Sequence, residues 1–349
     1  MADSNYYVDP DVVGGLGDGS SWANAFSSSN AAETALQRSI ASGDNVIVHC
    51  RSNAGSADST NFEINGWTTL SDGILYWQVD QADRHSGKWD TSKYRISASD
   101  VNAISNREEF VRFIGLQVEV TSATANGKSV WTQAAAAAGA AIYIENCIFK
   151  GHDNDTYSSP VCNLGDADPA YFIKNCVVYN GGQHSSTIGI RCASTSTSYI
   201  YNCTGYNNYV NFRQAAAGTT YCTNCLGDNS SGNDFVENPG TLYLQYCASN
   251  DASADDQDGD GTSGNNRINQ TFSFVDAANG DFHLQSSDAG AKDYGTSLAS
   301  DPNYPFSDDI DGVTRTGTWD IGADEYTSAG ANPKGVLNNP FSGCFGGMI

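Results

Sequence analysis

A short pattern recurs six times between residues 111 and 251, and it restricts the chain to a repetitive fold. Each copy is a run of alternating residues followed by a bend residue, and five copies place a cysteine directly after the bend. The bend positions are Gly115, Asn146, Asn175, Asn202, Asn224 and Tyr246, which are 31, 29, 27, 22 and 22 residues apart. These separations suit one coil of a β-solenoid, because they are too long for hairpins and too variable for a helical repeat.

The columns of the repeat alternate between apolar and polar residues. Two positions before the bend lie Phe113, Ile144, Ile173, Ile200, Cys222 and Leu244, and one position after it lie Leu116, Cys147, Cys176, Cys203, Cys225 and Cys247. The position between, directly before the bend, is mixed and mostly polar: Ile114, Glu145, Lys174, Tyr201, Thr223 and Gln245. Period-two alternation predicts strands with one buried face, and Asn suits the bend because it tolerates unusual φ values. We therefore predict parallel coils stacked about 4.8 Å apart.

The cysteines are interpreted as an inward ladder of this core, formed by Cys147, Cys176, Cys203, Cys225 and Cys247. Cys222 and Cys225 form a Cys-x-x-Cys pair, but a zinc site needs a second pair at ligand spacing and a redox motif needs a βαβ context, and neither is present. We expect the ten cysteines to be mostly free buried thiols. Free thiols fit synthesis in a reducing cytosol.

The two ends of the chain resemble right-handed parallel β-helix proteins of the pectate-lyase-like superfamily. "YYVDPDVVGGLGDGSSWANAF" and "AAETALQRSIASGDNVIV" are similar to the entrance of such proteins, where a strand, a Gly-rich turn and a short helix cap the solenoid. Ala32, Ala35, Leu36 and Ile40 fall near helical spacing, and Gly43 is expected to stop the helix. "FSFVDAANGDFHLQ" and "DIDGVTRTGTWDIGADEY" are similar to the closing segments of secreted and viral members.

The predicted fold class is therefore all-β, a single-stranded right-handed parallel β-helix. We expect an N-terminal cap at residues 1–45, the β-helix at 46–270, a C-terminal closing segment at 271–326 and an extended apolar tail at 327–349. The tail is interpreted as an assembly element, and its large apolar residues are Val336, Leu337, Phe341, Phe345, Met348 and Ile349. The alternative is a tail folded back over its own last coil, since these side chains are costly to expose.

Charge restricts the partners. The chain carries 17 Lys and Arg against 40 Asp and Glu, a net charge of −23, which disfavours nucleic acid and anionic lipid surfaces. Uncharged glycans, cations and other proteins remain as partners. The start "MADSNYYVDPD" is expected to be no secretory signal. The run "AAAAAGAAIYI" is only about half of the ~20 residues that a membrane helix needs, so no membrane insertion is expected.

No catalytic residues are assigned. The polygalacturonase-like branch of the superfamily carries paired carboxylates on successive strands, whereas this chain has "NCT", "GHD" and "GIR" at similar places. A pectate-type lyase would need a calcium-binding carboxylate cluster beside a basic residue. The candidates for that patch are Asp153, Asp155, Asp166, Asp168 and Arg191. The five histidines, His49, His85, His152, His184 and His283, lack metal-ligand spacing and are expected at the surface or core edge.

One motif is a candidate calcium site. Asp256, Asp258 and Asp260 alternate before Gly261, as in the first half of a calcium loop, but the twelfth position is Arg267 instead of a bidentate Glu. The alternatives are bound Ca²⁺ and a solvated acidic loop. No cofactor is otherwise required.

The first functional hypothesis is a non-enzymatic structural protein of a virus particle, located in the virion as a phage head decoration or a tail spike or fibre component. Its expected partners are other virion proteins or copies of itself, with surface glycans as further candidates. The alternatives are a secreted, extracellular polysaccharide lyase or glycoside hydrolase, and a bacterial surface adhesin.

Overall fold

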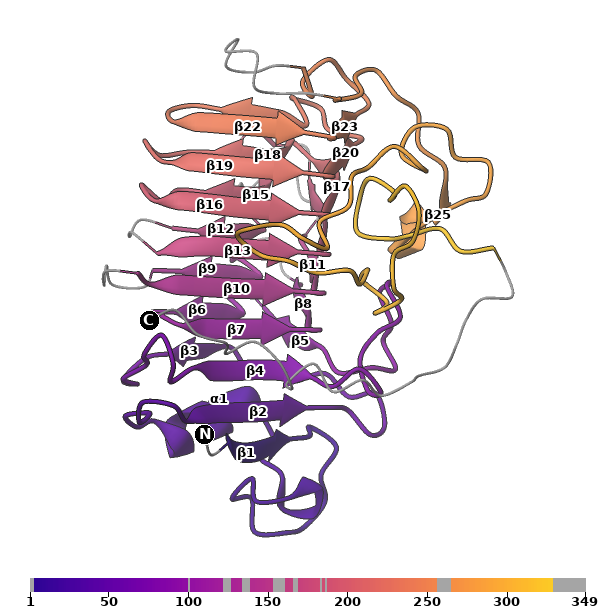
Figure 1. Ribbon diagram of the computed structural model, residues 1–349. Helices are drawn as coiled ribbons and strands as arrows, with labels where there is room; N and C mark the ends of the chain where they lie inside the picture. Colours follow the sequence, from indigo (N-terminus) through magenta and orange to yellow (C-terminus); the bar gives the residue numbers. More distant parts are fainter. Residues whose placement is uncertain are drawn as a thin grey trace.

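The chain folds into a right-handed parallel β-helix built from three parallel sheets (Figure 1). The structure, a computed structural model, describes residues 3–99, 101–121, 127–133, 139–152, 161–165, 169–182, 184–185, 187–255 and 265–328. Strands of one sheet come from successive coils, so every coil pairs with the coil below and the coil above. This is the fold that the repeat predicts.

Sheet 1 has nine strands and begins at the N-terminal end of the molecule. In order, they are β1 (Asp3–Val8), β2 (Asn45–Cys50), β4 (Leu75–Val79), β7 (Val111–Ile114), β10 (Ala141–Glu145), β13 (Ala170–Lys174), β16 (Thr197–Tyr201), β19 (Thr219–Thr223) and β22 (Thr241–Gln245). β1, which the sequence places in the cap, pairs in parallel with β2 and is the first strand of the solenoid.

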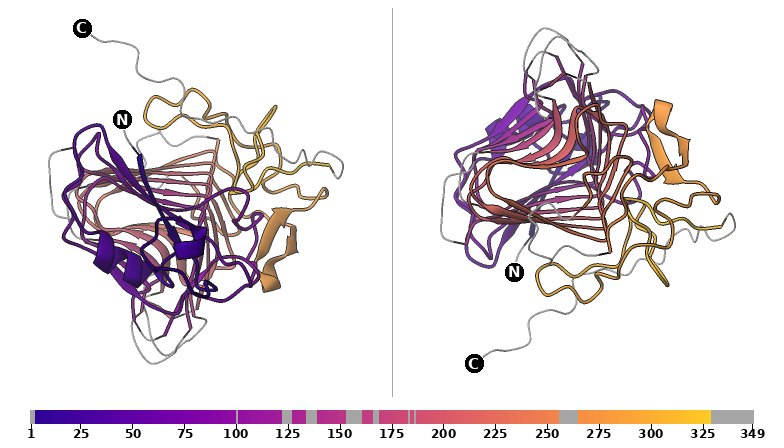
Figure 2. Two further views of the ribbon diagram at one scale, coloured as in Figure 1. Left: turned by 90° about the horizontal axis from the view of Figure 1, so that it is seen from below. Right: turned by 90° about the horizontal axis from the view of Figure 1, so that it is seen from above.

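Sheets 2 and 3 have seven strands each and complete the cross-section (Figure 2). Sheet 2 contains β5 (Ile96–Ala98), β8 (Gln117–Val120), β11 (Ile148–Lys150), β14 (Val177–Gly182), β17 (Thr204–Asn208), β20 (Leu226–Asp228) and β23 (Ala248–Ser249). Sheet 3 contains β3 (Phe62–Ile64), β6 (Ile104–Asn106), β9 (Val130–Thr132), β12 (Cys162–Leu164), β15 (Ile188–Cys192), β18 (Val210–Gln214) and β21 (Phe235–Glu237).

The bend between sheets 1 and 2 is the same left-handed residue in six successive coils. This bend row consists of Gly115, Asn146, Asn175, Asn202, Asn224 and Tyr246, whose φ values lie between 50° and 68°. Left-handed backbone costs an ordinary residue roughly 1–2 kcal/mol, and Gly and Asn adopt it most readily. Five of the six positions therefore carry a residue suited to the bend, and Tyr246, in the last of these coils, is the exception.

A second row of left-handed asparagines marks the bend that follows sheet 2. Asn180, Asn207 and Asn229 have φ values of 55°, 53° and 54°. Their amides form a ladder, because Asn207 Nδ2 donates to Asn180 Oδ1 at 3.0 Å and Asn229 Nδ2 donates to Asn207 Oδ1 at 3.3 Å. The sequence contains the signal, an Asn five residues after three of the four bend asparagines, which our sequence-based prediction did not use.

The cysteines line the interior. Cys147, Cys176, Cys203, Cys225 and Cys247 all have no exposed surface, and the nine cysteines within the described residues are free thiols. Cys176 Sγ donates to the Lys174 carbonyl at 3.2 Å, and Cys203 Sγ donates to the Tyr201 carbonyl at 3.3 Å. Burial raises the pKa of the Cys176 and Cys203 thiols well above the usual value, which keeps them protonated and unreactive.

The N-terminal helix is shorter than the sequence predicts. α1 spans Ser29–Leu36. Its N-cap is Ser28, whose hydroxyl accepts a hydrogen bond from Ala31 N at 3.1 Å. The helix ends at Leu36 instead of Gly43, because the chain beyond it becomes extended and Ile40 N donates to the Thr68 carbonyl at 2.9 Å. Among the described residues, no helix has the length and apolar character required to cross a membrane.

The C-terminal closing segment lies along the outside of the solenoid instead of extending it (Figures 1 and 2). It contains an antiparallel hairpin of β24 (Phe274–Asp276) and β25 (Asp281–Leu284). Its Phe282 and Ile310 pack on Ile148 and Val177, which project from the outer face of sheet 2. Around β11 and β14, sheet 2 is therefore buried on both faces, which explains the consecutive apolar residues Ile148-Phe149 and Val177-Val178 that follow two of the cysteines.

Side chains of the bend row also form hydrogen bonds with this closing segment. Asn146 Nδ2 donates to the Asp309 carbonyl at 2.6 Å and Asn175 Nδ2 donates to the Asp308 carbonyl at 3.0 Å. With its oxygen turned towards Arg315, the Asn202 amide accepts hydrogen bonds from that guanidinium at 3.0 to 3.2 Å. Each of these asparagines thus bends the backbone and holds the closing segment with its side chain.

This double role predicts different costs for two substitutions at Asn202. Asn202→Gly keeps the left-handed backbone but removes the buried contact to Arg315, which costs about 1–3 kcal/mol of unfolding free energy. Asn202→Ala removes the contact and adds backbone strain, so it is expected to be about 1 kcal/mol less stable than the glycine variant. Urea denaturation of both variants measures the difference. Equal stability of the two variants would show that the bend imposes no strain on alanine.

Candidate functional site

A groove of about 430 Å³ lies on the outer face of sheet 1, over β16, β19 and β22. Its volume is within the range of binding sites for small molecules or peptide side chains. The lining residues are Tyr199, Tyr201, Tyr221, Cys222, Thr223, Tyr243, Gln245, Asp301 and Asn303. The floor thus comes from three successive coils, and Asp301 and Asn303 form a wall supplied by the closing segment.

The groove is the upper part of an aromatic track, where upper means towards the later coils, as in Figure 1. The track consists of Tyr143, Phe172, Tyr199, Tyr221 and Tyr243, one residue from each of five coils in register on sheet 1. Neighbouring rings stack with centroids 4.9, 5.2, 5.5 and 5.0 Å apart and with planes within 20° of parallel. Since the rings stack on one another, the track presents mainly ring edges and hydroxyl groups to its surroundings.

The sequence analysis missed this track, although the repeat contains it. An aromatic residue stands three positions before each bend residue from Asn146 to Tyr246. The inward columns alone predict the solenoid, and outward positions of a solenoid carry no periodic requirement for apolar side chains. The constant aromatic character of an outward column is the signal that points to a functional surface.

The closing segment covers the lower half of the track. The Tyr304 ring lies 5.4 Å from the Tyr143 ring and 5.7 Å from the Phe172 ring. From the other side, the Arg112 guanidinium lies 3.8 Å from the centre of the Tyr143 ring. The upper half is open, and Tyr221 keeps 39% of its surface exposed.

Charge also divides the track into two halves. Beside its lower half, Arg112 pairs with Glu145 at 3.0 Å and Lys174 pairs with Asp308 at 2.9 Å. Beside the upper half the column continues with the uncharged residues Tyr201, Thr223 and Gln245.

Asp301 is the one carboxylate among the described residues that line the groove. The Tyr201 hydroxyl donates to Asp301 Oδ1 at 3.2 Å, and burial together with this carboxylate raises the pKa of Tyr201. Glycoside hydrolysis ordinarily requires two carboxyl groups on either side of the scissile bond. The groove can therefore bind a ligand through aromatic edges and neutral polar groups, but its described lining lacks that pair.

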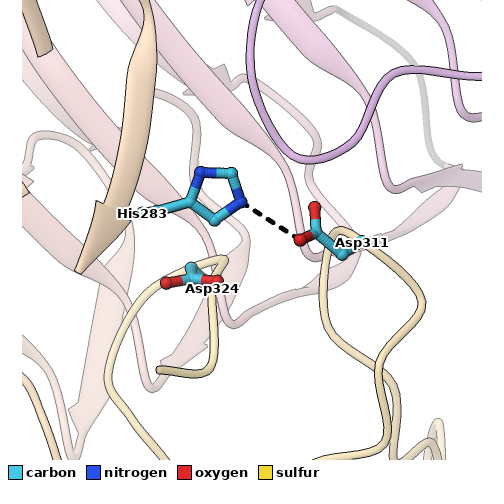
Figure 3. A group of neighbouring side chains, drawn as sticks. All are labelled: His283, Asp311 and Asp324. Carbon is cyan, nitrogen blue, oxygen red and sulfur yellow. Dashed lines mark hydrogen bonds and ion pairs between the residues drawn. The ribbon is translucent and has the colours of Figure 1, made fainter. Parts of the chain in front are cut away.

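A second cluster joins His283, Asp311 and Asp324 in the closing segment (Figure 3). Their potential ligand atoms lie within 4.8 Å of one another. His283 Nε2 is 3.1 Å from Asp311 Oδ2, and His283 Nδ1 is 2.5 Å from Asp281 Oδ1. Sequence spacing did not indicate this cluster, because Asp311 and Asp324 meet His283 only through long-range folding.

The protonation of His283 favours an ion-pair cluster over a metal centre. Burial lowers the pKa of His283, but hydrogen bonds to Asp281 and Asp311 act in the opposite direction, and the pKa rises to about 11. An imidazole must be neutral to bind a metal, so a cation at this cluster would have to displace the proton that Asp281 and Asp311 stabilise on His283. The cluster also fits tightly against a turn of the body, because a Cβ at Gly87 would overlap Asp311 Oδ1.

Two of the other histidines have clear structural roles. His85 is buried, contrary to the expected surface or core-edge position, because its Nε2 contacts the Asn146 carbonyl at 2.9 Å behind the bend row. Burial and the neighbouring Arg84 lower the pKa of His85 to about 3. His49 is partly buried and lies 3.0 Å from Asp80.

Several sequence-predicted site residues lie outside the described residues. These are the calcium candidates Asp256, Asp258 and Asp260, the lyase candidates Asp153, Asp155, Asp166 and Asp168, and the tail residues Val336, Leu337, Phe341, Phe345, Met348 and Ile349. Of the lyase patch, the structure places Arg191 on the outward side of β15, where its guanidinium donates to Asn163 Oδ1 at 2.9 Å. The calcium site and the lyase patch remain sequence-based expectations.

Comparison with known proteins adds little to this geometry. No family model matches the chain, and no curated protein matches it. Among solved structures, the crystal structure of pectate lyase Pel9A is similar, with 12% sequence identity and a TM-score of 0.34 over 94% of this chain and 97% of that one. The fold assignment rests on the three parallel sheets themselves.

Buried carboxylates of the closing segment predict a pH-dependent stability. Burial raises the pKa of Asp324 from 3.8 to about 6, so its stabilising contribution is fully present below pH 3.8 and is lost as the pH rises through 6. Asp324→Asn is expected to flatten the decline in unfolding free energy across this window by about 1–3 kcal/mol. Urea titrations at several pH values measure the slope.

His283→Gln is the control, because its raised pKa places its effect in a different window. The contribution of His283 is complete below pH 6.5 and is lost as the pH rises through about 11. The control variant should alter the pH dependence above pH 6.5, and it should keep a decline below pH 6 at least as large as that of wild type, because His283 lowers the pKa of Asp324. An Asp324→Asn variant with the wild-type slope below pH 6 would contradict the assignment of that slope to Asp324.

Proposed function

We propose that this chain is a non-enzymatic structural protein of a virus particle, and that it contacts neighbouring subunits through the aromatic track and the C-terminal tail. The observation that carries the proposal is the half-covered track. Its lower half is partly covered by Tyr304 of the same chain, while Tyr221 in its upper half is 39% exposed. The open part of the track continues an existing contact between protein segments, so it is suited to bind a further protein segment.

The nature of the existing cover supports a protein partner. Tyr304 and Phe306 of the closing segment pack on the track and on the neighbouring Tyr201. Aromatic side chains are enriched at protein interfaces because they bury a large area with few rotatable bonds. The row of aromatic side chains continues into the later coils with Tyr199, Tyr221 and Tyr243.

The interior supports folding in a reducing compartment. Nine buried thiols are free, and the ladder formed by Cys147, Cys176, Cys203, Cys225 and Cys247 has neighbours at the spacing of adjacent coils. Proteins matured in oxidising compartments ordinarily convert such thiols to disulfides where the geometry permits. Synthesis in a host cytosol followed by incorporation into a particle accounts for this core without a cofactor.

An uncharged surface glycan is the second candidate ligand, and the polar rim of the groove favours it. Tyr201, Gln245 and Asn303 offer hydroxyl and amide groups beside the exposed ring of Tyr221. Binding sites for small polar ligands combine such groups with aromatic walls. A glycan-binding role in the virion or on a bacterial surface uses the same groove, whereas a secreted lyase or hydrolase requires a catalytic set elsewhere.

Deletion of residues 331–349 tests the assembly role. The deletion should leave the thermal midpoint of the β-helix unchanged within about 2 °C, because the solenoid core and closing segment are complete by residue 326. It should abolish self-association or incorporation into particles, as measured by light scattering after size-exclusion chromatography. A truncated chain that associates like the full-length chain would refute assembly through the tail.

A test for enzymatic activity separates the structural role from the lyase alternative. We expect no unsaturated products when the protein is incubated with pectin or alginate in the presence of calcium. Ultraviolet absorbance of the products measures lyase cleavage directly. Cleavage that disappears in Arg191→Ala, but persists in the matched surface variant Arg213→Ala, would establish the lyase function in place of the structural one.

A further inference from the structure

A five-residue segment of the closing segment is repeated in the tail. Residues 303–307 read "NYPFS" and residues 338–342 read "NNPFS", so four of the five positions are identical. The chain has only 8 prolines, and two of them begin a Pro-Phe-Ser sequence. In the first copy, Tyr304 lies on the aromatic track and Phe306 packs beside the track on Tyr201, whereas the tail keeps the phenylalanine and has Asn339 in place of the tyrosine.

Phe306 anchors the first copy. Its ring lies 6.2 Å from Tyr201 and 5.7 Å from Trp319, and only 8% of the residue is exposed. The Lys174 ammonium group lies 5.0 Å from the centre of the Phe306 ring. The corresponding residue of the tail is Phe341, so the tail carries the same anchor side chain after the same proline.

The turn before this anchor forms the wall of the groove. Asp301 Oδ1 accepts hydrogen bonds from Asn303 N at 2.9 Å and from Tyr304 N at 2.8 Å. Asp301 and Asn303 therefore border both the occupied lower half and the open upper half of the track. A second segment that docked above them would continue the contact already made below them.

The open half provides space and suitable chemistry for a second anchor. Tyr221 and Tyr243 stack at 5.0 Å, and Thr223 and Gln245 lie beside them where Lys174 lies in the lower half. The groove volume of about 430 Å³ accommodates an aromatic side chain with its flanking proline. The uncharged column beside the open half imposes no requirement for a charged partner.

Charge complementarity favours the tail over a segment of average composition. Lys334 is the one charged side chain among residues 327–349, whereas the whole chain has a net charge of −23. The groove wall carries the carboxylate of Asp301. A tail with one positive side chain is therefore attracted to a body with this charge.

The path of the chain favours docking between copies. Tyr326, near the end of the described chain, packs beside Leu226 and Ala248 on the outer face of sheet 2. The groove lies on sheet 1, and the bend row with its bound closing segment stands between the two places. To reach its own groove the tail would have to pass around this corner, whereas the groove of a second copy imposes no such path.

We propose that residues 338–342 of one copy dock in the sheet 1 groove of a second copy, with Phe341 as the anchor. This inference rests on the proposed function, for which it names the partner and the site. The contact is heterologous, because the tail of one copy meets the groove of the next, and such contacts generate rings or filaments. It supplies the self-association that a particle component requires.

Complementation between two full-length variants tests the proposal. Phe341→Ala removes the anchor but keeps the groove, and Gln245→Trp fills the groove at an exposed position but keeps the tail. Each variant alone should self-associate about 30-fold or more weakly than wild type, the effect of losing an anchor residue in a pocket. Mixed together, the two should form a 1:1 complex, because one intact tail and one intact groove remain.

Matched controls accompany the two variants in analytical ultracentrifugation. Asn332→Ala truncates a polar tail residue that lies outside the repeated segment and outside the apolar set, and Thr197→Trp enlarges an exposed residue of β16 outside the groove. Both controls should associate like wild type. Circular dichroism melts of all four variants should match wild type, which separates lost association from lost folding.

Three results would overturn the inference. One is the absence of a 1:1 complex in the mixture. Another is a monomeric wild type together with a synthetic peptide of residues 331–349 that binds only the tail-deleted chain, which would place the tail in its own groove. The third is loss of association on tail deletion but not in Phe341→Ala or Gln245→Trp, which would preserve assembly through the tail and reject this groove as its site.

Discussion

The left-handed bend between sheets 1 and 2 is the constraint on which the rest of the structure depends. In four coils an asparagine adopts this bend, and the residue after it, a cysteine, is turned back into the core. Because the asparagine side chain points outward at the corner, it is free to bind another segment. Asn146 and Asn175 use it to hold the backbone of residues 308 and 309. One residue type thus sets the shape of the coil and the position of the segment that covers it.

The covering segment then decides which surfaces remain available. It buries the outer face of sheet 2 under Phe282 and Ile310, and it places Tyr304 on the lower half of the aromatic track. The covered part of sheet 2 has become core, whereas the outer face of sheet 1 is divided into a partly covered half and an open half. The groove exists because the closing segment turns at Asp301 before it reaches Tyr221 and Tyr243. The extent of the groove on sheet 1 is therefore set by the point at which the closing segment stops covering that sheet.

Acidic side chains have different surroundings in the closing segment and at the groove. In the closing segment, carboxylates are balanced by His283 and Arg315 of that segment and by Lys88 of the body, and Asp324 accepts a proton more readily than an exposed carboxylate does. At the groove, the column beside the track is uncharged, and Asp301 is the one carboxylate among the described lining residues. Charge in the first region stabilises the fold, and charge in the second region is available for recognition.

The sequence alone determined the solenoid, because the bend asparagines and the inward columns repeat at coil spacing and each coil must meet the same local requirements. It also contained the second asparagine row and the outward aromatic column, although neither was used in our sequence-based prediction. It did not determine the position of the closing segment, the meeting of His283 with Asp311 and Asp324, or the groove beside Asp301. Those depend on contacts between residues far apart in the chain, for which spacing carries no signal, so only the tertiary structure decided them.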